Sequence, residues 1–550
     1  LSMKYSIGLY GALCLLAGLS GCEELDHSIS EDPYGGGKVQ FELRLLSEDP
    51  VPAKGYPGDT VVFKADGLLD YCAATDTTLT VRVPDECVSS NTYLVMENQV
   101  FYGPYFPIEG NISVDKSWKL SSDVVDGIVY GAISQYGKPQ NNYLVGGFSH
   151  LAQYEHWCIG HVNSKGEVTR WSSSDFGTDY GVKTSVFEED VPPYINSISA
   201  FEDGRMLVSG MFSAFEVYNP KNGGLYDLAD RVYVNNIMVL RSNAHPDTTQ
   251  QYIFEDAGTE SNGTPIRYSF SKLNGGSLQP IVRSFVTSAQ KIVAVGNLTQ
   301  YVCNEYASSY VDSKQRISSV ASAFRMDDCG VLDSTYRLVD RTGRYSGAGG
   351  GNITDACMDK DDGVVLVGSF TSFDGVPAPG MVRLDADGNV DHAFLENLGT
   401  GPDGNVTMVR YNKALNKMMV VGGFEHVNGQ PRQQMAMLNP DGTLDGTFVP
   451  REIGGGAVNF AQLIDKEKVI VSGTFSTYGG VPRLGFLILE MDGTAQQKFN
   501  VPGTFNGQLY HVAETETTLG SYGLLLMGSF DRFNGQKANN VLMLEVNLEH

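Results

Sequence analysis

The chain has 550 residues, and its 64 acidic and 39 basic side chains give a formal net charge of −25 at pH 7. This acidity argues against nucleic-acid binding, which needs clustered Lys and Arg, and against electrostatic attachment to an anionic membrane. The 63 glycines and the many short apolar runs indicate an all-β protein rich in turns, with room for two or three domains.

The N-terminal segment has the pattern of a secretory signal. Lys4 precedes an apolar run, Ile7 to Leu19, which is too short to span a bilayer comfortably and is typical of a signal peptide. The run ends in Leu-Ser-Gly-Cys at Cys22, which resembles the lipobox of bacterial lipoproteins. The resemblance implies that residues 1–21 are removed and that Cys22 carries a lipid anchor. The alternative is a plain secretory signal with an incidental cysteine.

An acidic stretch follows the cysteine. Glu23, Glu24 and Asp26 resemble the surface-export signal of Bacteroidetes lipoproteins, which implies an outer-membrane protein that faces the cell exterior. The alternative is an ordinary polar tether. Residues 22–38, with three consecutive glycines at positions 35–37, are expected to be a flexible linker.

Residues 39–110 predict a small β domain of their own. Its expected strands are Val39–Leu45, Thr60–Ala65, Leu79–Val83, Tyr93–Met96 and Gln99–Tyr102. The Pro-Gly-Asp-Thr-Val order within Gly55–Phe63 resembles the start of TIG/IPT immunoglobulin-like domains, which implies a β-sandwich that acts as a spacer or binding unit. Cys72 and Cys87 are a candidate disulfide here, because a lipoprotein passes through an oxidising periplasm.

The remainder, residues 111–550, repeats one pattern of short strands. Each copy begins with an apolar run that contains glycine and ends at an apolar marker residue. A Gly-containing turn and a second apolar run follow. The marker residue of each copy is in turn Phe148, Phe212, Leu298, Phe370, Phe424, Phe475 and Phe530. Four strands per copy and a period of about 50 residues indicate propeller blades. The repeat resembles the delta-60 (DUF5122-like) type of β-propeller repeat, so we expect an all-β protein: an immunoglobulin-like β-sandwich followed by a seven-bladed propeller.

The last copy lacks its final strand, because the chain stops soon after Val541–Val546. An open sheet edge invites aggregation, so we expect a strand from elsewhere to close the ring. Ile112–Leu120 is an unpaired candidate strand just before the first copy. We predict that it lies beside Val541–Val546 and completes the seventh blade.

The glycines that precede the marker phenylalanines have a structural explanation. Glycine within a strand usually marks a bulge or a close approach of two backbones. Sheets of a propeller converge towards the axis, where bulk does not fit. We therefore expect the phenylalanines to fill the space between the sheets.

Few residues suggest chemistry. Trp171, Phe176 and Tyr180 lie in an insertion after the first copy and are candidate ligand-binding rings, with packing inside the loop as the alternative. Cys303 and Cys329 are a second candidate disulfide. No nucleophile elbow, phosphate loop or zincin helix occurs, so we expect no catalytic residue, metal or cofactor. A glycosidase-like carboxylate pair stays open as an alternative.

We expect a lipid-anchored binding or scaffold protein at the cell surface that captures a glycan or a peptide. The resemblance to Bacteroidetes surface lipoproteins also implies docking on an outer-membrane nutrient importer of the SusC/SusD type. The insertions between Phe148 and Phe370 would carry the binding face, because loops on a rigid scaffold usually do. The alternatives are a polysaccharide hydrolase or lyase acting at the channel mouth and a purely structural or adhesion protein.

Overall fold

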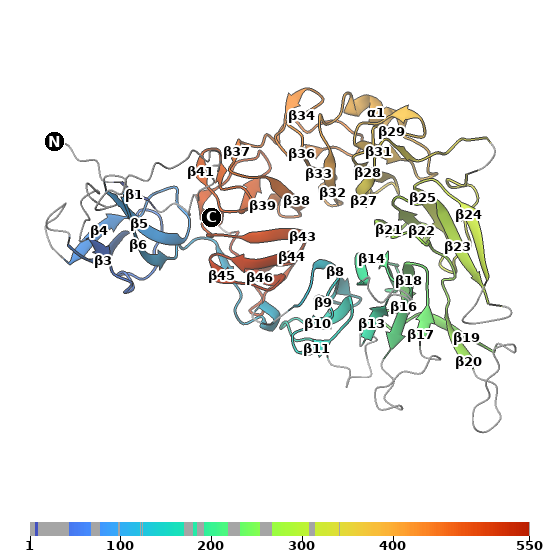
Figure 1. The fold of residues 1–550 in the computed structure, drawn as a ribbon, viewed down its shortest axis with the longest axis horizontal. Coiled ribbons are helices and arrows are strands. Elements are labelled where there is room, and N and C mark those ends of the chain that lie inside the picture. The colour runs from blue at the N-terminus through green and yellow to red at the C-terminus, as the bar shows by residue number, and fades with distance from the viewer. Residues whose placement is uncertain are drawn as a thin grey trace, which may run out of the picture.

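A computed structural model gives the fold of the protein (Figure 1). It describes residues 6–8, 43–67, 77–96, 99–121, 123, 125–169, 180–183, 192–217, 231–252, 267–306, 314–339 and 342–548. Within these ranges the protein is all-β, with a single α-helix, α1 (His392–Leu398). None of the helices in the described part of the chain has the length and apolarity needed to cross a bilayer.

The N-terminal part forms two small sheets that share a core. One sheet joins β2 (Arg44–Leu45), β3 (Thr60–Asp66) and β4 (Thr78–Arg82), and the other joins β1 (Ser6–Gly8), β5 (Ser90–Met96) and β6 (Gln99–Phe106). Phe63 and Phe106 meet edge to face between them, with ring centroids 5.9 Å apart. The predicted strands of this region are therefore confirmed from Thr60 onward, and the first one is reduced to β2 in its described part.

The larger part of the chain forms a series of antiparallel sheets around a common centre (Figure 1). The first six of them join, in chain order, β8 (Val129–Gln135), β9 (Lys138–Gly146) and β12 (Ile159–Val162); β14 (Tyr194–Ala200), β15 (Met206–Met211) and β18 (Ile237–Leu240); β21 (Arg283–Val286), β22 (Ile292–Val295) and β25 (Ala323–Met326); β27 (Ile353–Met358), β28 (Val364–Gly368) and β31 (Met381–Leu384); β32 (Val406–Asn412), β33 (Lys417–Gly422) and β36 (Met435–Leu438); and β38 (Val458–Ile464), β39 (Lys468–Gly473) and β42 (Phe486–Glu490). In each sheet the first strand lies nearest the centre.

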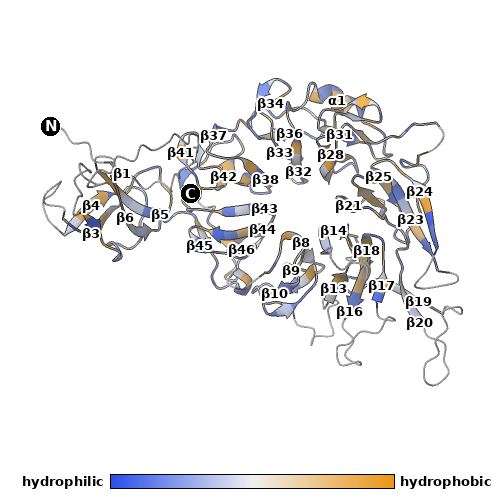
Figure 2. Ribbon diagram, in the orientation of Figure 1, coloured by the Kyte–Doolittle hydropathy of each residue, from blue (hydrophilic) through white to orange (hydrophobic). Residues whose placement is uncertain are grey.

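Short outer strands extend the periphery. They are β10 (His150–Leu151) with β11 (Tyr154–Glu155); β13 (Tyr180–Lys183), β16 (Ala214–Val217) and β17 (Arg231–Tyr233); β19 (Thr248–Tyr252) with β20 (Arg267–Ser271); β23 (Gln300–Glu305) with β24 (Lys314–Ser319); β26 (Ala348–Gly349), β29 (Ser372–Phe373) and β30 (Val376–Pro377); β34 (His426–Val427) with β35 (Gln430–Pro431); and β37 (Ile453–Gly454), β40 (Thr477–Tyr478) and β41 (Val481–Pro482). Strand β42, the third strand of its sheet, is mainly hydrophobic, whereas the peripheral strand β34 is more polar (Figure 2).

The last sheet joins the two ends of this region. It contains β43 (Asn506–Glu516), β44 (Tyr522–Phe533), β45 (Gln536–Lys537), β46 (Val541–Val546) and, as the outermost strand, β7 (Ile112–Val114). Strand β7 runs antiparallel to β46 with Val114 opposite Leu544 and Ile112 opposite Val546. The predicted pairing is confirmed for these three residues. Beyond them the chain turns into a short 3₁₀ helix (Lys119–Ser121), and buried Trp118 packs in a core shared by the first and last sheets.

The recurring glycines do sit where two backbones approach closely. In six of the sheets, one residue of the first strand bulges out and has no partner on the second strand; we call it the skipped residue. The residue just before this bulge pairs with the repeat glycine. A Cβ atom there would lie 2.0–2.1 Å from a backbone carbonyl oxygen, at Gly146, Gly210, Gly368, Gly422, Gly473 and Gly528. The β21–β22 pair has no bulge, and its Gly296 is less confined. No other residue type fits the six crowded positions.

The marker residues behave as expected. Each is at most 3% exposed, and the set is Phe148, Phe212, Leu298, Phe370, Phe424, Phe475 and Phe530. Phe424 lies in a core formed by the β27 and β32 sheets, and Phe148 lies in the core between the first and last sheets. These rings therefore hold neighbouring sheets together.

The prediction of four strands per copy is wrong in the best-matched copies. The segment containing Phe394 forms helix α1, because the Asp391 side chain caps it by accepting a hydrogen bond from the Phe394 N–H at 3.1 Å. The segment up to Phe448 forms a turn in which the Asp445 carboxylate accepts bonds from the N–H and hydroxyl of Thr447. Local carboxylate–backbone bonds replace a fourth ladder at both places.

Candidate functional site

A cavity of about 360 Å³ lies where the innermost strands converge. Strands β8, β14, β21, β27, β32 and β43 all contribute to its lining, so we call it the central channel. Its volume falls within the range of about 300–1,000 Å³ that is typical of small-molecule sites. The central channel is therefore the first place to look for function.

The strand bulges shape this channel. Asn196 and Tyr510 are both skipped in the strand register, so their backbone carbonyls are free of the ladder. Bulges often re-aim groups beside functional sites. Here the two carbonyls accept hydrogen bonds from arginines: Arg283 Nη1 donates to Asn196, and Arg410 Nη2 donates to Tyr510 at 3.2 Å.

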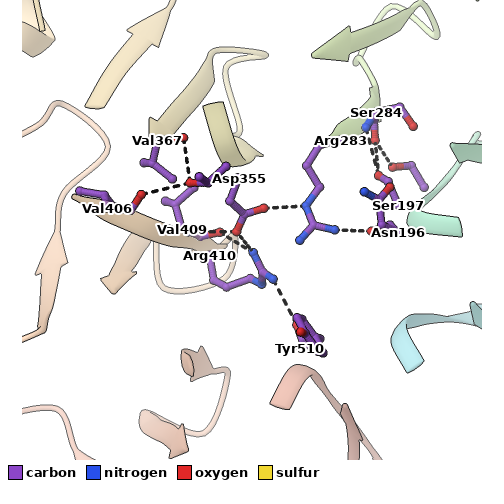
Figure 3. Close-up of polar contacts among 12 residues, drawn as sticks. Asn196, Ser197, Arg283, Ser284, Asp355, Val367, Val406, Val409, Arg410 and Tyr510 are labelled. Atoms are coloured by element: carbon purple, nitrogen blue, oxygen red, sulfur yellow. Dashed lines mark hydrogen bonds and ion pairs between the residues drawn. The ribbon is translucent and has the colours of Figure 1, made fainter. Parts of the chain in front are cut away.

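Between the two arginines lies the carboxylate of Asp355 (Figure 3). Arg283 Nε donates to Asp355 Oδ1 at 2.7 Å, and Arg410 Nη1 donates to Oδ2. The Val409 N–H also donates to Oδ2, at 3.1 Å. Asp355 is anchored on β27, Arg283 on β21 and Arg410 on β32, so three separate sheets build the cluster.

The cluster carries one excess positive charge in a sheltered place. The side chains of Asp355, Arg410 and Arg283 are 5%, 15% and 18% exposed, respectively. Burial by itself would raise the pKa of Asp355, but the two guanidinium groups and the Val409 N–H hold it below its ordinary value. The carboxylate is therefore ionised, and two cations share one anion.

His511 and two tyrosines form another part of the wall. Burial, with the charges of Arg410 and Arg283 adding to it, lowers the pKa of His511 to about 3, so its imidazole is neutral at ordinary pH. The rings of Tyr130 and Tyr510 meet edge to face, with centroids 5.0 Å apart. Burial raises the pKa of Tyr130 to about 12, so its hydroxyl stays protonated.

Two polar atoms in the channel lining lack partners within the described part of the chain. Arg283 uses Nε and Nη1 in the bonds above, and its Nη2 donates to no described residue. The side-chain oxygen of Asn196 is buried without a hydrogen-bond partner. Of these two atoms only the Asn196 oxygen is buried, and burying an unsatisfied polar atom costs free energy, so this oxygen calls for a partner that the described part of the chain does not provide.

The sequence-predicted site residues lie elsewhere. Cys22, Cys72, Trp171 and Phe176 fall outside the described residues. Tyr180 begins β13, where its backbone pairs with Val217. The proposed ligand-binding and lipidation roles therefore stay predictions.

The cysteine pairs need correction. Cys87 is a buried free thiol. Cys303 and Cys329 are also free, so the predicted bridge between them is wrong. Cys303 lies on β23 opposite Arg316, whereas Cys329 lies in the turn after β25, which belongs to another sheet.

Histidines do not gather into a metal site among the described residues. The one cluster of potential ligand atoms there is Asp327, Asp328 and Cys329. Asp328 in this cluster already pairs with Arg205 at 2.9 Å. This surface cluster gives no support for a metal.

Sequence reasoning missed Arg283, Asp355 and Arg410. They belong to no motif, and 72 and 55 residues separate them along the chain. A usable signal does exist: Asp355 is a charge inside an apolar first strand, one position after the bulge. An ionisable residue in that place must face either a core or the channel.

Comparisons with known families match three parts of the chain. The family "Domain of unknown function (DUF5122) beta-propeller" matches residues 360–394 and 416–448. Domain of unknown function DUF5008 matches residues 18–74 and 72–104, and domain of unknown function DUF5124 matches residues 108–193. No curated protein matches the chain.

Comparison with solved structures finds matches of low similarity, one of which is described as a β-propeller domain. The WD40 β-propeller domain of Doa1 is 9% identical, with 80% of this chain and 97% of that chain covered and a TM-score of 0.39. YCF48 bound to D1 peptide is 10% identical, with coverage of 80% and 99% and a TM-score of 0.37. A protein of unknown function from Bacteroides caccae is 8% identical, with coverage of 62% and 89% and a TM-score of 0.24. Such distant likenesses say nothing about ligand or chemistry. The repeats establish that this chain is an all-β repeat protein of the β-propeller type.

Proposed function

We propose that this protein is a lipid-anchored binding or scaffold protein of the cell surface that captures its ligand, a glycan or a peptide, in the central channel. In this proposal an immunoglobulin-like module on a tether carries a seven-bladed propeller, and β7 closes the ring. Support comes from the pairing of β7 with β46 and from the core shared by the first and last sheets.

The observation that carries the binding function is the composition of the channel wall. A cavity of about 360 Å³ is lined by the two arginines of the charged cluster, by aromatic rings and by the residue Asn196, whose side-chain oxygen is buried without a partner. Sites for small ligands combine a concave surface with a few well-placed polar groups in this way. A purely structural ring would gain nothing from burying such groups, because an apolar filling of the same volume is at least as stable.

Surface display and docking on a SusC/SusD-type importer rest on the sequence alone. The lipobox at Cys22 and the acidic stretch after it are the features that support them. The hydrolase alternative finds no specific support in the channel. The carboxylate of its charged cluster, Asp355, is held by two arginines, whereas a glycosidase needs a pair of carboxyl groups about 5–10 Å apart.

The test is binding of the full chain to glycan and peptide arrays, with a variant that plugs the channel. A Cβ atom at Gly131 would face His511 at 4.0 Å with nothing closer, so Gly131→Leu places a side chain in the cavity with little strain. Gly446→Leu is the matched control, because a Cβ there has no neighbour within 4 Å.

We expect Gly131→Leu to abolish binding and Gly446→Leu to preserve it. A third variant that lacks residues 171–190 separates the channel from the insertion that the sequence favours. Binding that survives the plug and disappears with this deletion would move the site from the channel to the loops.

A further inference from the structure

We infer that the central channel takes a small hydroxy acid: a molecule with one carboxylate, which binds Arg283, and a hydroxyl group, which binds Asn196. This inference rests on the proposed function and adds the chemical class of the ligand. It depends on charge, on the two unpartnered atoms and on the aromatic wall, which are independent features of the same cavity.

The charge balance asks for one anion. Arg283 and Arg410 are positive, Asp355 is their shared counter-ion, and His511 next to them is neutral. A sheltered excess cation is costly unless it is paired, and a single carboxylate would neutralise it. The chain as a whole is strongly acidic, so this positive site stands against the overall charge rather than following from it.

The hydrogen-bond pattern selects where the anion binds. Both terminal nitrogens of Arg410 are engaged, Nη1 with Asp355 and Nη2 with Tyr510. Arg283 keeps Nη2 without an acceptor among the described residues, while two other bonds fix its guanidinium plane. A guanidinium that is already oriented binds a carboxylate with little further loss of entropy.

A carboxylate alone leaves the second atom unsatisfied. The side-chain oxygen of Asn196 is an acceptor, and an ionised carboxylate cannot donate to it. The backbone carbonyl of the same residue accepts from Arg283, so the two ligand groups would bind near each other. A hydroxyl group close to the carboxylate supplies the missing donor.

The wall fits a sugar ring as the frame of this acid. Tyr130 and Tyr510 present an aromatic corner to the cavity, and the cavity has room for a monosaccharide. The C–H face of a pyranose packs on aromatic rings, while its hydroxyls are held by polar groups. Among hydroxy acids, a uronic acid combines the carboxylate, the hydroxyl and the ring.

The experiment is calorimetric titration of the full chain with D-glucuronate, D-glucose and inorganic phosphate. We expect D-glucuronate to bind and the other two to bind at least tenfold more weakly. Arg283→Gln should weaken D-glucuronate binding by about tenfold or more, the typical value of a hydrogen bond to a charged group. Asn196→Ala should weaken it by a smaller factor, and Arg316→Gln, on the outer strand β24, should leave it unchanged.

A second measurement does not depend on any variant. Binding of an anion beside His511 should raise its low pKa, which NMR of the imidazole protons follows in the unmodified protein. Equal binding of phosphate and D-glucuronate, or no change at His511 on D-glucuronate binding, would overturn the inference. A neutral glycan or a peptide that binds and is lost in Gly131→Leu, with no D-glucuronate binding, would overturn the hydroxy acid and leave the proposed function standing.

Discussion

Replacement of Gly422 by alanine tests the close approach that we see in six sheets. A Cβ atom at this position would lie 2.1 Å from the carbonyl oxygen of Asn405 and 2.9 Å from Cα of Val406. Non-bonded heavy atoms normally rest about 3.5–4 Å apart, so the strands must separate by more than 1 Å. Both obstacles are backbone atoms, and no side-chain rotation can relieve the clash.

The magnitude follows from the cost of overpacking. Extra methyl groups in a packed interior typically cost about 1–3 kcal/mol, and a backbone obstacle puts this variant at the upper end, about 3 kcal/mol. The adjacent Gly423 is the internal control. A Cβ there has no neighbour within 4 Å, and its φ is not in the left-handed region. Gly423→Ala should be neutral or should stabilise by about 0.4–1 kcal/mol through the unfolded chain.

The assay is urea denaturation of both variants beside the parent protein, followed by hydrogen exchange of β32 and β33. We expect the midpoint to fall only in Gly422→Ala, with faster exchange at the bulge between these strands. Equal midpoints for the two variants would refute the reasoning, because the glycine would then be present for some other reason than the confined Cβ.

Three further predictions concern other parts of the molecule. Burial lowers the pKa of His161 to about 4, so below its ordinary value of 6.5 the unfolded chain binds a proton that the folded chain does not. The free energy of unfolding should therefore fall as pH falls, by about 2 kcal/mol at pH 5 from this residue. His161→Gln should remove that loss when denaturation is measured as a function of pH. Tyr105→Phe deletes the hydroxyl that donates to the backbone carbonyl of Asn534 at 2.8 Å, and it should cost about 1 kcal/mol in thermal unfolding. Ser113→Pro removes an N–H from β7, and it should speed proteolysis near β7 and hydrogen exchange in β46 while exchange in β33 stays unchanged.

Local chemistry made much of the fold predictable. Asn-Gly and Asp-Gly pairs are hairpin signals, and in the structure Asn428 and Gly429 have φ of 49° and 70°, as the pair Asp374 and Gly375 has 49° and 78°. The pairing of β7 with β46 was also predicted, although its premise was wrong: the six preceding inner sheets have three strands each, so the last copy lacks none, and β7 is an additional strand on its edge. The fourth strand was wrongly predicted, because the caps formed by Asp391 and Asp445 outweigh a short alternating pattern.

The channel cluster was out of reach for a different reason. Arg283, Asp355 and Arg410 come together only because their strands β21, β27 and β32 lie side by side around the centre. Sequence spacing carries no information about which residues of different sheets face each other across the ring. The Cys303–Cys329 prediction failed in the same way, since closeness in sequence did not place the two thiols on one sheet.

The bulge occupies the same position in six sheets, but the residue in it differs from sheet to sheet. Its backbone course is the same in six sheets, and it fixes the glycine opposite it. The skipped residues nevertheless differ in side chain: they are Tyr130, Asn196, Thr354, Thr407, Asn459 and Tyr510. At Asn196 and Tyr510 the ring arrangement uses only the carbonyl oxygen, to which an arginine from another sheet is anchored. The side chains of Thr354 and Asn459 bond to the backbone of the next sheet, whereas Tyr130, Asn196 and Tyr510 line the central channel. Under the proposed function, it is these three lining positions, rather than the repeat motif, that set the ligand preference of the channel.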